Sequence, residues 1–169
     1  IVAAADSGIK TLADLKGKRL AVGAPKSGTE LNSRAILKAA GLSYKDLGKV
    51  EYLPFGESIE LMKNRQLDAS LISAGLGVAA IRDLAASVKM TIVTIPADIV
   101  PRIGDPAYQV AAIPAKTYEG QNAEVATIKV QNFLVTHEGV SADVVYKMTR
   151  SMFEHLDTLY AAHAAAKAI

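Results

Sequence analysis

The chain has 169 residues, 50% of them hydrophobic and 5% aromatic, with 19 Lys and Arg against 17 Asp and Glu. This length suits one ordinary domain, and a net charge of +2 is too balanced for a protein that binds the phosphate backbone of nucleic acids. The absence of cysteine excludes thiol catalysis, disulfide bonds and thiolate zinc sites. No apolar run approaches the roughly 20 residues that cross a bilayer. The composition therefore predicts a soluble α/β domain.

The two ends of the sequence predict a piece of a longer chain. The first residue is Ile1 rather than Met, and the alanine-rich pattern at 160–169 is helical without a stop signal. A signal peptide could have been lost with the rest. The lack of cysteine fits an extracytoplasmic protein without demanding one.

Short apolar strands and helical stripes alternate through the first half of the chain. We expect strands at 19–23, 50–55, 68–73 and 90–95, and helices at 31–40, from Gly56, and at 78–86. Alternation of this kind predicts parallel βαβ units with right-handed crossovers. The expected sheet therefore carries helices on both faces.

The pattern changes after Pro96. Prolines make the next stretch irregular, with a short strand at 108–113. The segment 127–136 is rich in β-branched residues and is predicted as a strand running out of the lobe, although a helical period also fits. Ser141 is then a good N-cap for a long helix with an apolar stripe of Val145, Met148, Met152, Leu156 and Leu159.

The segment between the first predicted strand and its helix nearly matches a phosphate loop. Gly23 and Gly28 have the right spacing, but Thr29-Glu30 follow where Lys and then Ser or Thr are needed, so we reject an NTPase. Two interpretations remain open. Ser27 to Glu30 reads as a capping box, and the same turn would direct backbone N–H groups toward a carboxylate or another small anion.

Other candidate motifs are weaker. Gly75 to Ala80 matches the G-x-G-x-x-A dinucleotide fingerprint with Asp98 further on, but it follows the third strand, so tight packing explains its glycines better. His137-Glu138 begins like a zinc-protease helix, but Ser141 stands where the second His belongs. His155 and His163 have no acidic partner at metal spacing. We therefore expect no metal and no cofactor.

Three loops each follow the carboxyl end of a predicted parallel strand, the edge of an open α/β sheet where ligands bind. Because these loops converge, we expect one shared crevice for a ligand. Its candidate residues are Ser27, Gly28, Thr29, Asn32, Phe55, Ser73, Ala74 and Gly75.

Several segments in the same order resemble a known family. The run 8–23 resembles the entry into the second lobe of a type II periplasmic solute-binding protein. The segments 23–30, 41–42, 52–57, 67–69, 73–75, 113–121 and 144–149 resemble the TAXI family, the solute receptors of tripartite ATP-independent periplasmic (TRAP) transporters. The likeness covers nearly the whole chain. The family usually has Gly where this chain has Lys26, and often Pro near Gly77.

The resemblance implies a three-layer α/β lobe with a mainly parallel sheet, one half of a clamp that closes on a solute. Residues 1–18 would be the incoming connection between lobes, 19–125 the second, ligand-binding lobe, and 126–169 the strand and helix returning toward the first lobe. It also implies a periplasmic, immunogenic receptor without enzymatic activity. Such a receptor passes a small organic anion, an amino acid or a dicarboxylate such as glutamate, to TRAP permease membrane subunits.

Two other functions stay open. The lobe could belong to an ABC-type solute-binding protein or to the ligand-sensing effector domain of a regulator. A nucleotide-dependent α/β enzyme is a weaker alternative that rests on the Gly75–Ala80 fingerprint.

Overall fold

The computed structural model describes residues 1–162 and 166–167, which divide into two compact units, 1–130 and 131–169. His163 and part of the helix expected at 160–169 lie outside the described residues. Within the described part of the chain, no helix is long and apolar enough to cross a membrane.

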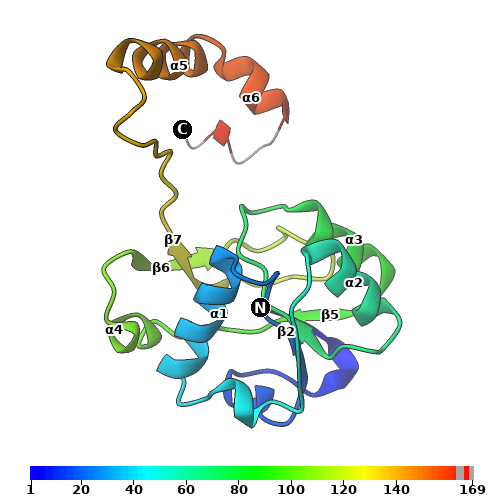
Figure 1. The fold of residues 1–169 in the computed structure, drawn as a ribbon. Helices are drawn as coiled ribbons and strands as arrows, with labels where there is room; N and C mark the ends of the chain where they lie inside the picture. Colours follow the sequence, from blue (N-terminus) through cyan, green and yellow to red (C-terminus); the bar gives the residue numbers. More distant parts are fainter. Residues whose placement is uncertain (163–165, 168–169) are drawn as a thin grey trace. The chain divides into compact units, whose positions relative to one another are not determined.

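The first unit carries most of the regular structure (Figure 1). Its strands are β1 (Val2–Ala4), β2 (Arg19–Ala21), β3 (Lys49–Glu51), β4 (Ala69–Ser70), β5 (Met90–Ile92), β6 (Tyr108–Ile113) and β7 (Val125–Val130). Its α-helices are α1 (Gly28–Ala39), α2 (Phe55–Lys63), α3 (Ala79–Ser87) and α4 (Ile99–Ile103). The predicted alternation of strands and helices is therefore confirmed, with strands shorter than expected.

The central sheet has five strands in the order β3-β2-β4-β1-β5. Strand β2 runs parallel to both β3 and β4, whereas β1 lies antiparallel between β4 and β5. The sheet is therefore mostly parallel, as predicted. Beyond the strand ends, Val22 N–H donates to Glu51 O and Leu71 N–H donates to Ala21 O. These bonds hold the carboxyl ends of the three neighbouring parallel strands at one edge.

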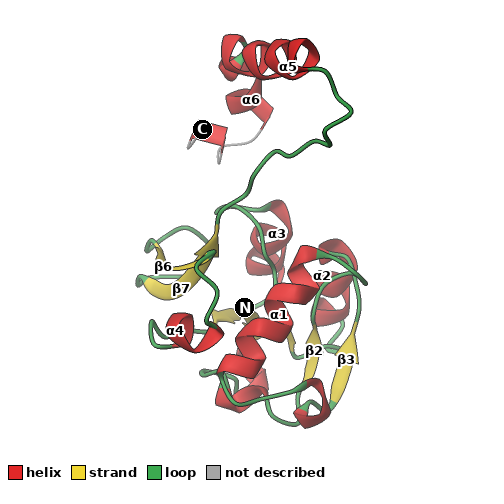
Figure 2. Ribbon diagram, turned by 60° about the vertical axis from the view of Figure 1, so that its left-hand side comes forward, coloured by secondary structure: helices red, strands yellow, loops and turns green. Residues whose placement is uncertain are grey.

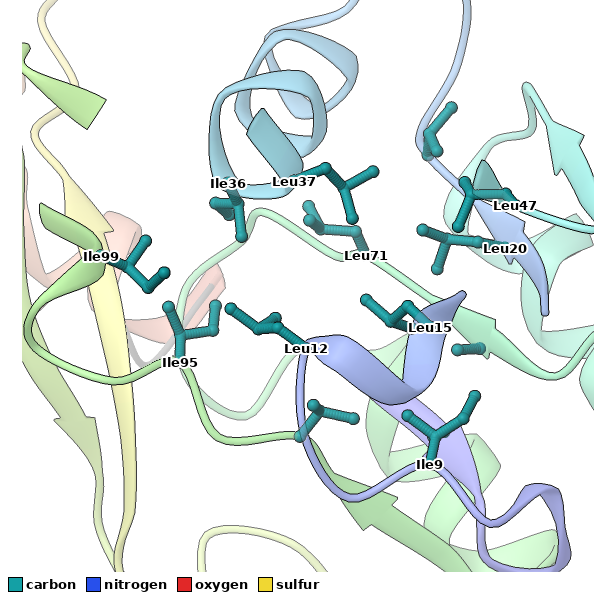
Figure 3. Packing of buried hydrophobic residues seen from close by; sticks show 14 of the residues in the cluster. Ile9, Leu12, Leu15, Leu20, Ile36, Leu37, Leu47, Leu71, Ile95 and Ile99 are labelled. Carbon is teal, nitrogen blue, oxygen red and sulfur yellow. The ribbon is translucent and has the colours of Figure 1, made fainter. Parts of the chain in front are cut away.

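Helices cover both faces of this sheet, which gives three layers (Figure 2). Alternate side chains of β2 divide between the two cores: Leu20 packs with Ile36 and Leu37 of α1, and Ala21 packs against the α2 and α3 side. Figure 3 shows the first core, which also holds Leu12 and Leu15 from the segment before β2. This burial places the first turn of α1 at the carboxyl edge of the sheet.

Strand β1 was not predicted from the sequence. Val2 pairs with Ser70 on one side and with Ile92 on the other, so its partners lie far along the chain. Its three residues include two alanines, which have little intrinsic preference for strands. The expected division of the chain at residues 18 and 126 stays a prediction.

Strands β6 and β7 form a separate antiparallel hairpin, with Tyr108 opposite Val130 and Ile113 opposite Val125. The strand predicted at 127–136 is therefore correct in type but wrong in extent. It starts earlier, at Val125, and it stops at Val130, where its pairing with β6 ends. The ladder bonds to β6 stabilise the extended backbone, and residues 131–137 have no regular structure.

The second unit contains α5 (Ala142–Glu154) and α6 (Leu156–Ala162). Ser141 caps α5 as predicted, because its side chain accepts a hydrogen bond from Val144 N–H. The single apolar stripe expected from Val145 to Leu159 is divided between two helices, since α5 ends at His155. Tyr146, Met148 and Phe153 of α5 are exposed.

One buried polar group in the sheet lacks a partner. The Ser70 hydroxyl lies in a residue that is 1% exposed, and it makes no hydrogen bond within the described part of the chain. Burying a hydroxyl without a partner costs free energy. Ser70→Ala is therefore expected to raise the free energy of unfolding by about 0.5–1.5 kcal/mol in urea titrations. A loss of stability of that size would mean that the hydroxyl binds a buried water.

Candidate functional site

The turn between β2 and α1 depends on one glycine. Gly23 has φ +98°, and a Cβ atom there would lie 2.7 Å from the Thr29 Cβ. Lys26 also adopts a left-handed conformation, with φ +60°, at the position where the resembled family has glycine. The turn is therefore built tightly against the first turn of α1.

Ser27 is the N-cap of α1, as the sequence predicted. Its Oγ accepts a hydrogen bond from Glu30 N–H at 3.2 Å. The N–H groups of Gly28 and Thr29 have no acceptor within 1–162 and 166–167. As the first amides of a helix, they carry the partial positive charge of its N-terminus.

The other half of the expected capping box does not form. Glu30 does not return to the backbone of Ser27. Its carboxylate pairs with Arg34 and accepts a hydrogen bond from Tyr44 Oη at 2.9 Å. Burial of the ring and the bond to Glu30 raise the pKa of Tyr44 well above its ordinary value. The Glu30 carboxylate is therefore buried and paired within the fold.

Asn32 and Ser73 join two of the three predicted loops. Asn32 Nδ2 donates to Ser73 Oγ at 2.8 Å, which ties α1 to the segment after β4. Tyr108 Oη of β6 donates to Asn32 Oδ1, also at 2.8 Å. Burial raises the pKa of Tyr108, with a smaller contribution from Asp105, so its hydroxyl stays protonated at neutral pH. Local sequence patterns do not indicate this role for Tyr108, because it lies 76 positions along the chain from Asn32.

The remaining candidate residues occupy the same edge. Phe55 is the first residue of α2, just after β3, and is half-buried. Ala74 and Gly75 are exposed in the segment after β4. Tyr52 packs edge-on against Tyr44, with ring centroids 6.3 Å apart. The three loops thus follow three adjacent parallel strands, and Asn32 and Ser73 are joined by a hydrogen bond.

A pocket of about 530 Å³ lies at the opposite, amino edge of the sheet. Several charged side chains line it, but most are already paired. Arg19 binds Asp68, and Lys63 binds Glu60 and Asp83. None of the eight candidate residues lines this pocket. The candidate residues lie at the other edge of the sheet, on α1 and in the segments that follow β2, β3 and β4.

The dinucleotide fingerprint lacks the geometry of a phosphate site. Helix α3 begins only at Ala79, and Gly77 N–H donates to the buried Tyr118 hydroxyl at 3.1 Å. Asp98 is paired with Arg102. The Gly77 N–H and the Asp98 carboxylate, which a dinucleotide would use, are therefore already bonded to other groups of the protein.

The structure is a mostly parallel sheet between two helical layers, with loops gathered at the carboxyl edge where open α/β sheets bind ligands. A model of the NMT1-like family matches residues 1–169, and the chain belongs to this family. Among solved structures, the chain is similar to the periplasmic aliphatic sulphonate binding protein SsuA from Escherichia coli, with 31% identity and a TM-score of 0.38. That match covers 42% of this chain and 22% of the SsuA chain.

Proposed function

We propose that the chain is the second lobe of an extracytoplasmic receptor that captures a small organic anion and delivers it to a TRAP permease. The observation that supports this proposal most directly is the hydrogen bond between Asn32 and Ser73, which joins α1 to the loop after β4. Family membership supports a binding protein rather than an enzyme. The resemblance of the motifs to TAXI receptors supports an amino acid or dicarboxylate such as glutamate.

The anion would bind to uncharged hydrogen-bond donors. Gly28 and Thr29 offer backbone N–H groups at a helix N-terminus, which favours a negative charge by about 0.3–1 kcal/mol when exposed and up to about 2 when partly buried. Closure by a first lobe would exclude water and strengthen each of these bonds. The lobe by itself is therefore expected to bind weakly, and Phe55 would contact the solute only in the closed clamp.

The Thr29 hydroxyl tests this site. Its residue is 8% exposed, and the hydroxyl has no hydrogen-bond partner in the part of the chain that the structure describes. Thr29→Ala is expected to weaken solute binding by about 1–3 kcal/mol because a hydrogen bond to a charged group is lost. Calorimetry of the full-length receptor against a panel of amino acids and dicarboxylates, glutamate included, measures the change.

Ser27→Ala is the matched comparison. Because the Ser27 hydroxyl caps α1, its loss is expected to reduce stability by about 0.5–2 kcal/mol. Thermal melts of both variants separate the two roles. Unchanged solute affinity in Thr29→Ala would remove that residue from the site, and no binding of any anion in the panel would overturn the proposed function.

A further inference from the structure

A chain of hydrogen bonds runs from the hairpin to the candidate site. Tyr108 lies on β6, Asn32 on α1 and Ser73 after β4, and both bonds that join them measure 2.8 Å. Tyr108 and Asn32 are half-buried, whereas Ser73 is exposed at the carboxyl edge. The chain therefore begins inside the protein and ends at the surface proposed to hold the solute.

In the structure each of these two bonds has a defined donor and acceptor. A protonated tyrosine has one hydrogen to donate, and it is directed to Asn32 Oδ1. The amide is thereby oriented with its NH₂ group toward Ser73, whose oxygen accepts. The hydroxyl hydrogen of Ser73 is then left without an acceptor among residues 1–162 and 166–167.

We propose that Tyr108 is a positioning residue that sets the selectivity of the site: through Asn32 it holds Ser73 as a hydrogen-bond donor, so the surface beside Ser73 accepts an oxyanion head group and disfavours an ammonium. This inference rests on the proposed function and adds the chemical class that the site selects. If the Asn32 side-chain amide were flipped, its Oδ1 would accept the hydroxyl hydrogen of Ser73. The candidate site would then lose that donor.

The charged side chains near the candidate residues are compatible with recognition of an anion by uncharged hydrogen-bond donors. Glu30 is buried and paired with Arg34, so it does not repel an anion. Lys26 is exposed in the turn before α1 and leaves the local charge favourable to an anion. Selection between an oxyanion and an ammonium therefore depends on whether Ser73 presents its hydroxyl hydrogen to the ligand.

The test is a titration of the ¹⁵N-labelled chain with acetate, methanesulfonate and methylammonium at constant ionic strength, followed by the amide signals of Gly28 and Thr29. Wild type is expected to bind both anions more tightly than methylammonium. Tyr108→Phe is expected to weaken binding of both anions by about three- to tenfold, the effect of one net hydrogen bond. Tyr146→Phe, an exposed tyrosine of α5, is the control and is expected to change nothing.

A double-mutant cycle separates positioning from a purely structural effect. If Tyr108 acts through Ser73, Tyr108→Phe has no further effect on anion affinity in a Ser73→Ala background. Equal losses in both backgrounds would overturn the inference and leave the proposed function standing. An unchanged anion affinity in Tyr108→Phe would also overturn the inference and leave the proposed function standing. Failure of wild type to bind either anion would contradict the proposed site itself.

Discussion

Gly23→Ala is expected to lower the free energy of unfolding by about 2–6 kcal/mol. The left-handed backbone, with φ +98°, costs about 1–3 kcal/mol for a residue with a Cβ atom. The added methyl group also meets Thr29 Cβ at 2.7 Å and Glu30 N at 3.1 Å, and overpacking of this kind costs about 1–3 kcal/mol more. Urea unfolding followed by circular dichroism measures the loss.

Gly28→Ala is the control for this variant. Gly28 is the first residue of α1, and a Cβ atom there meets nothing within 4 Å. Alanine favours a helix over glycine by up to about 1 kcal/mol, so this variant is expected to be as stable as wild type or more so. Equal stability of the two variants would contradict the close approach of Gly23 to Thr29.

Asp68→Ala is expected to cost about 2–3 kcal/mol at neutral pH, because hydrogen bonds to a charged group are lost from the amino edge of the sheet. The Asp68 carboxylate accepts from Arg19 N–H at 2.8 Å, from Arg19 Nε at 3.1 Å and from Arg19 Nη2 at 2.6 Å. These bonds join β2 to the residue just before β4. Asp98→Ala removes an exposed ion pair and is expected to cost less than about 1 kcal/mol.

The same carboxylate makes stability depend on pH. Hydrogen bonding to Arg19 lowers the pKa of Asp68 below its ordinary value of 3.8. The stabilisation that ionised Asp68 gives to the folded state is therefore complete above about pH 4, and it is lost as the pH falls toward the lowered pKa. Urea titrations between pH 6 and pH 2 are expected to show a smaller loss of stability in Asp68→Ala than in wild type. Parallel losses would contradict this role.

The parts of the fold that local patterns specify could be predicted from the sequence. The strands around Leu20, Val50 and Met90 and the helices between them follow hydrophobic periods, and Ser27 and Ser141 are N-caps with a local signature. The same alternation placed three loops at one edge of the sheet. That much of the candidate site was predictable because parallel strands share their carboxyl edge.

Features that depend on distant partners could not be predicted in this way. Strand β1 forms because Val2 pairs with Ser70 and Ile92, and β7 ends at Val130 because β6 offers no further partner. Glu30 follows the capping-box pattern, but Tyr44 and Arg34 compete successfully for its carboxylate. These contacts are set by packing, which no local period encodes.

Tyr108 is the clearest example at the site. Nothing in its neighbours along the chain indicates a contact with Asn32, because the two residues are separated by 76 positions in the sequence. A serine, a threonine and an asparagine near a helix start can be found by position. The tyrosine that donates to the asparagine cannot.

The most direct test of an anion site at the carboxyl edge of β2, β3 and β4 is the map of amide shifts when the wild-type chain is titrated with acetate. The largest shifts are expected at Gly28, Thr29 and the segment 73–75. Largest shifts at Arg19 and Lys89, which line the pocket at the amino edge, would contradict it.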